Sequence, residues 1–309
     1  MIVPHTDPAS KPKPYKRIIF YHQTHYKDDK YISLQPSILP ATGVTHVIIA
    51  AIHLNTPERI TLNDDLYDAD KFIPLWDEVR QLQEAGVKVL GMLGGAAQGS
   101  YTKMDGSLEG FRRWYQPLRK MIAWARFDGL DLDIEEAMSL GGVVRLIDHL
   151  KTDFGQSFLI TLAPVAPALL NRQNLGGFNM EELEKGLGSR IACKTRDYDT
   201  IIARGWPQEK VVIGLVTSPA NCSGHVKEAK LRACLKELVS RYPRIGGIMG
   251  WEYYNSVTEA SPQIGEPWKW AEMINDMLNG AYIEEEMVLA SDRIEGEAKK
   301  YEGHDGDLS

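Results

Sequence analysis

Three carboxylates stand at every second position of the run DGLDLDIE, residues 128–135. Side chains of a β-strand alternate between its two faces, so Asp131, Asp133 and Glu135 are expected on one face and the apolar residues between them on the other. Carboxylates this close cannot all ionise at low cost, so at least one should have a raised pKa and hold a proton near neutral pH. Such a group can serve as a general acid, and Glu135, at the carboxyl end of the strand, is the best placed candidate.

Two other interpretations of this acidic run remain open. The first is a solvated surface strand, although apolar residues on both sides of each carboxylate argue against simple exposure. The second is a divalent-metal site built on a D-x-D pair at the end of a strand. Such a site would be expected beside a phosphate-binding loop, and the glycine-rich run at residues 93–101 lacks the lysine of a P-loop. We expect neither a metal nor a cofactor.

The elements that must position these carboxylates follow an α/β pattern. Seven short strand-like runs are found at residues 17–22, 46–52, 88–93, 129–134, 158–163, 211–216 and 246–251. Apolar residues recur at helical spacing over residues 72–82, 146–150 and 231–239. Strands that alternate with helices predict a parallel sheet, and no linker or internal repeat divides the pattern. The prediction is a (β/α)8 TIM-type barrel, with a doubly wound open sheet as the alternative.

One strand of that barrel, the sixth, is short or absent in the sequence. The stretch between the strands at 158–163 and 211–216 is long enough for another βα unit, yet its only strand-like piece is RIAC, residues 190–193. We therefore expect a truncated or missing sixth strand, which leaves two unpaired edges and opens the core beside the carboxylates. A natural deletion, an incomplete gene model and an alternatively spliced transcript would each produce this sequence.

Composition and charge exclude several classes of partner. The chain has 309 residues, of which 43% are hydrophobic and 25% charged, and no apolar run approaches the roughly 20 residues of a membrane span. Its formal net charge of −7 argues against a nucleic-acid partner, which would favour clustered Lys and Arg. The three cysteines lack CxxC spacing, so neither a disulfide framework nor a zinc site is predicted.

Both ends of the chain differ from the rest in composition. Residues 1–14 are rich in proline and residues 283–309 are rich in charge, so we expect a flexible N-terminal segment and a disordered tail around a barrel at 15–282. The first residues hold prolines and charges where a signal peptide needs about 7–15 apolar residues. This predicts a cytoplasmic protein, or an extracellular one if the N-terminus is incomplete.

DGLDLDIE resembles the D-G-x-D-x-D-x-E signature of glycoside hydrolase family 18, which includes chitinases and endo-β-N-acetylglucosaminidases. The segments at 91–101 and 246–256 are similar to the family's third-strand glycine motif and to its last strand, which ends in Trp. Those at 158–167 and 265–274 look most like fungal endo-β-N-acetylglucosaminidases. The resemblance implies a barrel that hydrolyses β-1,4 bonds next to N-acetylglucosamine. It favours the chitobiose core of N-glycans over chitin.

The resemblance also implies roles for the three carboxylates, matched position by position. Glu135 would protonate the glycosidic oxygen. Asp133 would orient the substrate's acetamido group, whose oxygen attacks the sugar in place of an enzyme carboxylate. Asp131 would share a proton with Asp133, which keeps the charge of the pair tunable.

Three further residues would bind the substrate. Trp251 would form the apolar floor under the reacting sugar, and Tyr21 and Gly95 would complete the site. On residue type alone, a lone Trp is more often a core residue than a binding residue, and a Tyr is as readily one as the other. We expect the protein to act as a monomer on a glycan or on chitin.

The sequence departs from the family pattern in two places. Met92 stands where the third-strand motif has a serine, which removes a small hydroxyl beside the acid strand. The missing sixth strand would normally supply the Tyr that hydrogen-bonds the acetamido carbonyl. A sugar-binding protein that no longer turns over its ligand is therefore kept as an alternative function.

Overall fold

The computed structural model describes residues 16–170, 175–187, 191–192 and 195–280. The expected flexible ends, 1–14 and 283–309, lie outside the described residues. The strands of the wall are β1 (Arg17–His22), β4 (His46–Thr56), β7 (Lys88–Gly94), β8 (Gly129–Asp133), β9 (Leu159–Leu162), β10 (Ile191–Ala192), β11 (Val211–Val216) and β12 (Gly247–Trp251). All neighbouring pairs among them are parallel.

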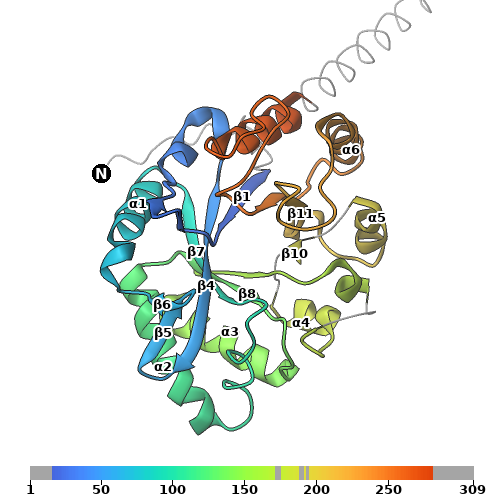
Figure 1. The fold of residues 1–309 in the computed structure, drawn as a ribbon. Coiled ribbons are helices and arrows are strands. Elements are labelled where there is room, and N and C mark those ends of the chain that lie inside the picture. The colour runs from blue at the N-terminus through green and yellow to red at the C-terminus, as the bar shows by residue number, and fades with distance from the viewer. Residues whose placement is uncertain (1–15, 171–174, 188–190, 193–194, 281–309) are drawn as a thin grey trace, which may run out of the picture.

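The order of the strands around the wall is β10-β11-β12-β1-β4-β7-β8-β9 (Figure 1). Except for β9 and β10, every two strands that are consecutive among these eight are paired, and β12 returns to pair with β1. In a doubly wound sheet the order reverses at a switch point, whereas in a barrel the last strand meets the first. The wall is therefore a TIM-type barrel left open between β9 and β10, and the alternative of a doubly wound sheet was wrong.

The sixth strand is truncated, as the sequence predicts. β10 holds two residues, which pair with Val211 and Val212 of β11. In the described part of the chain no strand pairing joins β10 to β9. The edge position of β9 shows in its burial: Leu159, Ile160 and Thr161 are half-buried.

Helices cover the outside of this wall (Figure 1). They are α1 (Ile73–Glu84), α2 (Leu108–Ala125), α3 (Leu140–Phe154), α4 (Met180–Leu187), α5 (Thr195–Ala203), α6 (Glu228–Arg241) and the helical residues 268–280. Both α2 and α3 begin after a serine whose side chain accepts a hydrogen bond from a backbone N–H of the first turn: Ser107 from Gly110, and Ser139 from Gly142. Single-turn 3-10 helices span Gln35–Ile38, Pro40–Thr42, Asp70–Phe72, Ala166–Leu170 and Gln208–Lys210.

Alternation along the strands produces two hydrophobic cores. The larger core lies between the strands and the helices and includes Leu130 and Leu132 of β8. The smaller core fills the barrel interior and includes Tyr21, Ile48 and Met92. The carboxylate strand thus has one apolar face toward the helices and another face toward the barrel axis.

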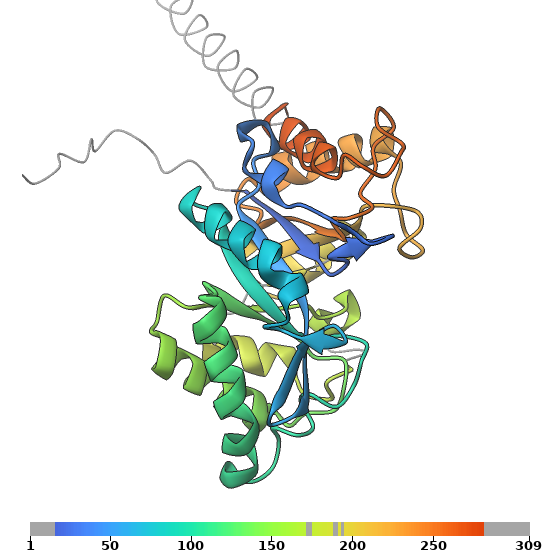
Figure 2. The same cartoon turned by 60° about the vertical axis from the view of Figure 1, so that its left-hand side comes forward.

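Two short hairpins extend the wall at the carboxyl ends of its strands. β5 (Arg59–Leu62) pairs antiparallel with β4, and β6 (Asp65–Leu66) pairs with β5. Figure 2 shows the long β4 running into this extension. A second hairpin joins β2 (Tyr26–Lys27) to β3 (Lys30–Tyr31). The sequence pattern predicts neither hairpin. No helix in the described ranges has both the length and the apolar character that crossing a bilayer requires.

Candidate active site

The three carboxylates of the acidic run lie on the inner side of β8 and its continuation. Leu130 and Leu132 belong to the core under the helices, and Ile134 packs against it. Asp131, in contrast, lines the barrel interior, and Asp133 and Glu135 line an open cavity at the rim. The alternation predicted from the sequence is therefore confirmed, and a solvated surface strand is excluded.

Asp131 is the innermost of the three and is 1% exposed. Its Oδ2 accepts a hydrogen bond of 2.7 Å from the Tyr21 hydroxyl, and its Oδ1 accepts a short one from the Thr161 hydroxyl. Burial raises the pKa of Asp131 to about 6, while the hydrogen bonds from Thr161 and Tyr21 act in the opposite direction because they favour the ionised form. Asp131 is thus held in place from both sides, by β1 and by β9.

Asp133 has the most strongly raised pKa of the acidic run. Burial, together with the negative charges of Asp131 and Glu135, raises the pKa of Asp133 to about 8. The raised pKa of Asp133 favours its protonated form beside Asp131 near neutral pH. The raised pKa values of Asp131 and Asp133 agree with the expectation that at least one carboxyl of the run has a raised pKa.

A cavity of about 450 Å³ opens at the carboxyl ends of the strands and brings five of the six predicted site residues together. Its lining is Tyr21, Gln23, Ala51, His53, Met92, Gly94, Gly95, Ala96, Ala97, Asp133, Glu135, Ala163, Met249 and Trp251. Asp131 lies below the cavity, and its hydrogen-bond partner Tyr21 lines the cavity. In the described part of the chain, residues 164–248 contribute nothing to the lining, so the wall lacks a contribution from the region of the truncated sixth strand.

Gly95 has a conformation that an L side chain rarely adopts, with φ of 89°. A Cβ added there would lie 3.0 Å from the Met92 side chain and 3.5 Å from Asp133 Oδ2. The Gly95 N–H also donates to the Asp133 carbonyl at 3.0 Å. A glycine at this position therefore permits close approach of the β7 loop to the end of β8.

Trp251, the last residue of β12, packs on Tyr21 with 5.3 Å between the ring centroids. Its carbonyl accepts hydrogen bonds from the Thr217 N–H at 3.0 Å and from Asn221 Nδ2 at 2.8 Å. The ring lines the cavity and is half-buried, as a residue in contact with a ligand requires. Trp251 therefore lines the cavity and also packs against the apolar interior of the barrel.

Four residues near the carboxylates were missed in the sequence. Thr161 faces Asp131 in the register of β8 and β9, and a polar residue at an inward position of that strand is a signal that could have found it. Glu136 and Glu252 are buried carboxylates that accept hydrogen bonds chiefly from loop backbone, which leaves no signal in the sequence. His53 lines the cavity because β4 continues past the predicted end of its strand.

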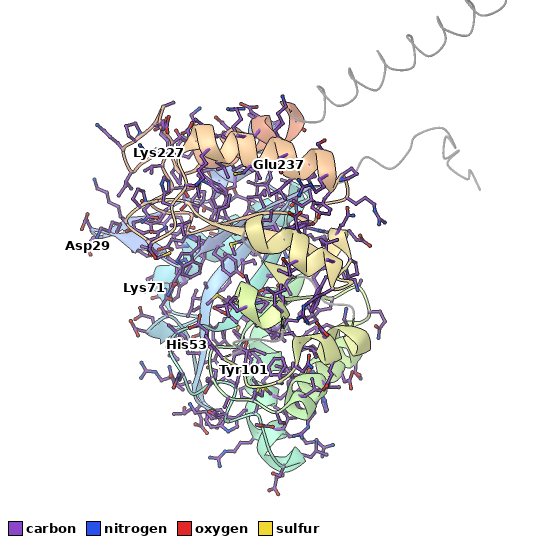
Figure 3. The ribbon with its side chains drawn as sticks, turned by 90° about the vertical axis from the view of Figure 1, so that its right-hand side faces the viewer. Asp29, His53, Lys71, Tyr101, Lys227 and Glu237 are labelled. Atoms are coloured by element: carbon purple, nitrogen blue, oxygen red, sulfur yellow. The ribbon has the colours of Figure 1, made fainter. Side chains whose placement is uncertain are left out.

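The cavity that Glu135 lines continues into a second, more polar one of about 590 Å³. The two share Gln23, His53 and Ala97. Figure 3 shows His53 and Lys71, which also lines the second cavity, along the same edge of the molecule. Lys71 is ion-paired with Asp65 at 2.6 Å. The two cavities therefore adjoin one another along this edge.

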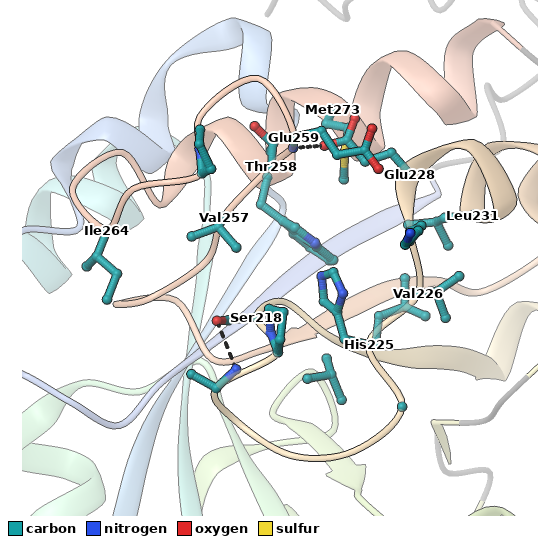
Figure 4. Close-up of a pocket in the computed structure, with 18 residues that line it drawn as sticks. Ser218, His225, Val226, Glu228, Leu231, Val257, Thr258, Glu259, Ile264 and Met273 are labelled. Carbon is teal, nitrogen blue, oxygen red and sulfur yellow. Dashed lines mark hydrogen bonds between the residues drawn. The ribbon is translucent and has the colours of Figure 1, made fainter.

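A third cavity, of about 560 Å³, lies between the segments that follow β11 and β12 (Figure 4). Its lining is mainly apolar, and His225 points into it. None of the predicted site residues lines this cavity. In the described ranges no group of three or more His, Cys, Asp or Glu side chains is arranged to hold a metal ion.

Comparison with known proteins agrees with this geometry. Residues 16–218 match Glycosyl hydrolases family 18. The fold is similar to that of the chitinase ChiC from Aspergillus fumigatus, with a TM-score of 0.77 and 48% identity, over 83% of this chain and 97% of that one. It is also similar to a fungal endo-β-N-acetylglucosaminidase of the same family, with a TM-score of 0.80 and 38% identity, over 85% and 98% of the two chains.

A curated relative, Chitinase 2 of Rhizopus oligosporus, is 28% identical over 195 residues. That match covers 57% of this chain, which spans about a third of the length of the relative, 35%. The match to the family, the carboxylate signature and the open barrel lead to one assignment. The chain belongs to glycoside hydrolase family 18.

Proposed function

We propose that this protein hydrolyses β-1,4 bonds next to N-acetylglucosamine with the help of the substrate's own acetamido group. The observation that carries the proposal is the placement of the carboxylates: Asp133 and Glu135 face one cavity beside Trp251, while Asp131 is buried beneath them. A substrate whose acetamido group lies against Asp133 would present its glycosidic oxygen to Glu135.

In the first step, Glu135 donates its proton to the glycosidic oxygen as the C1–O bond breaks. The acetamido oxygen forms the new bond to C1, which gives an oxazolinium ion and frees the leaving sugar as an alcohol. Asp133 accepts a hydrogen bond from the acetamido N–H, and the proton of the pair moves to Asp131. The buried partners Tyr21 and Thr161 hold Asp131 in position for this exchange.

In the second step, water attacks C1 from the side that the leaving group has vacated. Glu135 takes a proton from that water, which restores the acid, and the acetamido oxygen leaves C1. The anomeric configuration is therefore retained after two displacements. Trp251 supplies an apolar face against the sugar ring in both steps.

Two natural targets contain this bond. Chitooligosaccharides are favoured by the 48% identity to a fungal chitinase. The chitobiose core of N-glycans is favoured by the similarity to a fungal endo-β-N-acetylglucosaminidase and by the polar second cavity, which offers hydrogen-bonding groups to a branched glycan. The sequence segments favour the glycan, but the higher identity leads us to propose chitooligosaccharides as the first target.

Incubation with chitotetraose, with a high-mannose glycoprotein and with cellotetraose tests the proposal. Cellotetraose has the same linkage but carries hydroxyls in place of the acetamido groups. We expect release of β-configured products from chitotetraose and none from cellotetraose. Release of glycan without cleavage of chitotetraose would reverse the order of targets, and cleavage of cellotetraose would contradict the acetamido mechanism.

A further inference from the structure

Glu136, which follows the proposed acid directly in the chain, is a buried carboxylate with an exposed fraction of 7%. It accepts three hydrogen bonds: from the Gly99 N–H at 2.8 Å, from the Tyr101 N–H at 2.7 Å and from the Thr102 hydroxyl at 3.0 Å. All three donors belong to the loop between β7 and α2. We propose that Glu136 is a positioning residue that fixes Glu135 in its cavity by locking this loop to the end of β8. This inference rests on the proposed role of Glu135 as the acid.

The site around Glu136 is built for a carboxylate and not for an amide. Oε2 accepts hydrogen bonds from the Gly99 N–H and the Thr102 hydroxyl, and Oε1 accepts one from the Tyr101 N–H. An amide in either orientation would turn its NH2 group toward one of the two backbone N–H groups, which cannot accept a hydrogen bond. A buried donor left without a partner costs about 1–3 kcal/mol.

Two sets of hydrogen bonds, here called ties, join the loop after β7 to the end of β8, and Glu135 lies between them in the chain. The first is the hydrogen bond from the Gly95 N–H to the Asp133 carbonyl, and the second is the set made by Glu136. The loop also supplies the cavity wall from Gly94 to Ala97. The same two ties therefore fix the position of Glu135 and the position of this part of the cavity wall.

The buried Tyr101 connects the second tie to the end of β7. Its hydroxyl donates to the Leu93 carbonyl at 2.6 Å, and its ring would lie 2.5 Å from a Cβ placed at Gly94. Release of Glu136 would thus free the loop at the point where it packs against the end of β7. A misplacement of about 1 Å at a reacting group costs on the order of 10²-fold in rate.

The test compares Glu136→Gln with Glu78→Gln. Glu78 of α1 is also buried, at 8% exposed, and also accepts three hydrogen bonds, from Tyr31, Ser33 and the Leu34 N–H. It does not line the catalytic cavity. Both substitutions break a buried carboxylate cluster, so both should lower the melting temperature, and only Glu136→Gln should disturb the acid.

Two substrates separate a misplaced acid from a weakened fold. The leaving group of chitotetraose is an alcohol and needs the proton from the acid. The leaving group of a 4-nitrophenyl chitobioside is a stable phenolate and needs that proton far less. For Glu136→Gln we expect kcat to fall about 10²-fold on chitotetraose and less than about tenfold on the aryl glycoside. Glu78→Gln should keep the wild-type ratio of the two rates. Thr102→Val, which removes one donor, should change the ratio in the same direction by a few-fold and serves if Glu136→Gln does not fold.

An unchanged ratio of the two rates in Glu136→Gln, or in Thr102→Val if the first variant does not fold, would overturn the inference and leave the proposed function standing. A wild-type protein that hydrolyses neither substrate would overturn the proposed function, and this inference with it.

Discussion

The Tyr21 hydroxyl donates a 2.7 Å hydrogen bond to Asp131 Oδ2 and so links β1 to β8 across the barrel interior. The two residues come from strands that are not neighbours, because β4 and β7 lie between them in the wall. Trp251 packs on the same Tyr21 ring. One tyrosine therefore connects the innermost carboxylate to the apolar floor proposed for the sugar.

Tyr21→Phe removes this link without a change of ring size. A hydrogen bond to a charged group contributes about 1.5–3 kcal/mol, and its loss raises the pKa of Asp131 further because the ionised form loses a donor. We expect kcat to fall about tenfold or more. Tyr115→Phe is the control, since Tyr115 makes an equally long bond to Asp153 between α2 and α3. Equal activity of the two variants would show that the Tyr21 bond has no catalytic part.

Asp133→Asn should change how stability depends on pH. Burial and the charges of Asp131 and Glu135 raise the pKa of Asp133 to about 8, while the unfolded chain has an ordinary value near 3.9. Between these values the folded protein holds a proton that the unfolded chain has released, so stability falls as the pH rises from about 4 to 8. Asp133→Asn has no carboxyl to titrate at this position, so the variant does not lose stability in this way. The melting temperature of Asp133→Asn minus that of wild type should therefore be larger at pH 8.5 than at pH 5. We expect about 2–4 °C for each kcal/mol of stability that wild type loses over this range. A difference that does not change with pH would contradict the raised pKa.

Gly95→Ala should reduce activity more than its effect on stability explains. Its φ of 89° costs an alanine about 1–2 kcal/mol, and its Cβ would press on Met92 beside Asp133. Gly86→Ala is a matched control, because Gly86 has a φ of 87° and nothing within 4 Å of the added Cβ. We expect similar melting temperatures and a loss of at least about tenfold in kcat/KM for Gly95→Ala alone. Equal kcat/KM in both variants would remove Gly95 from the site.

A restored sixth strand should make the barrel both more stable and more active. β10 has two residues and β9 is an edge whose Leu159, Ile160 and Thr161 are half-buried, so water reaches β9, whose Thr161 donates a hydrogen bond to Asp131. Insertion of the sixth strand of a close relative before Lys194 would pair both edges. We expect a higher melting temperature and a rise of about 10²-fold in hydrolysis, from better placement of the acetamido group. Equal values before and after insertion would show that the open barrel is fully competent.

The strands of the wall were predictable because each is a short β-branched run between helical patterns. The truncation of β10 was predictable for the same reason, since RIAC offers a single β-branched residue. The hairpin of β5 and β6 was not, because RITL is only four residues long and carries no strong turn signal.

The arrangement of the acidic run was predictable because alternation alone places Asp131, Asp133 and Glu135 on one face. The partners that hold the site were not. Glu136 is bound mainly by backbone N–H groups, which every residue except proline carries, so no sequence pattern marks it. The position of Gly95 against Asp133 likewise depends on how a loop closes, and periodicity does not encode that closure.

Hydrolysis and binding of chitotetraose by Glu135→Gln test the central claim most directly. Glutamine keeps the shape and the hydrogen bonding of Glu135 but has no proton to give, and general acid catalysis typically contributes about 10²–10⁴-fold. The account predicts a loss of at least that size in kcat, with a Kd measured by calorimetry that stays within a few-fold of wild type. Near-full hydrolysis by Glu135→Gln would contradict it, and a wild-type protein that binds chitotetraose without any product would show instead a sugar-binding member of the family.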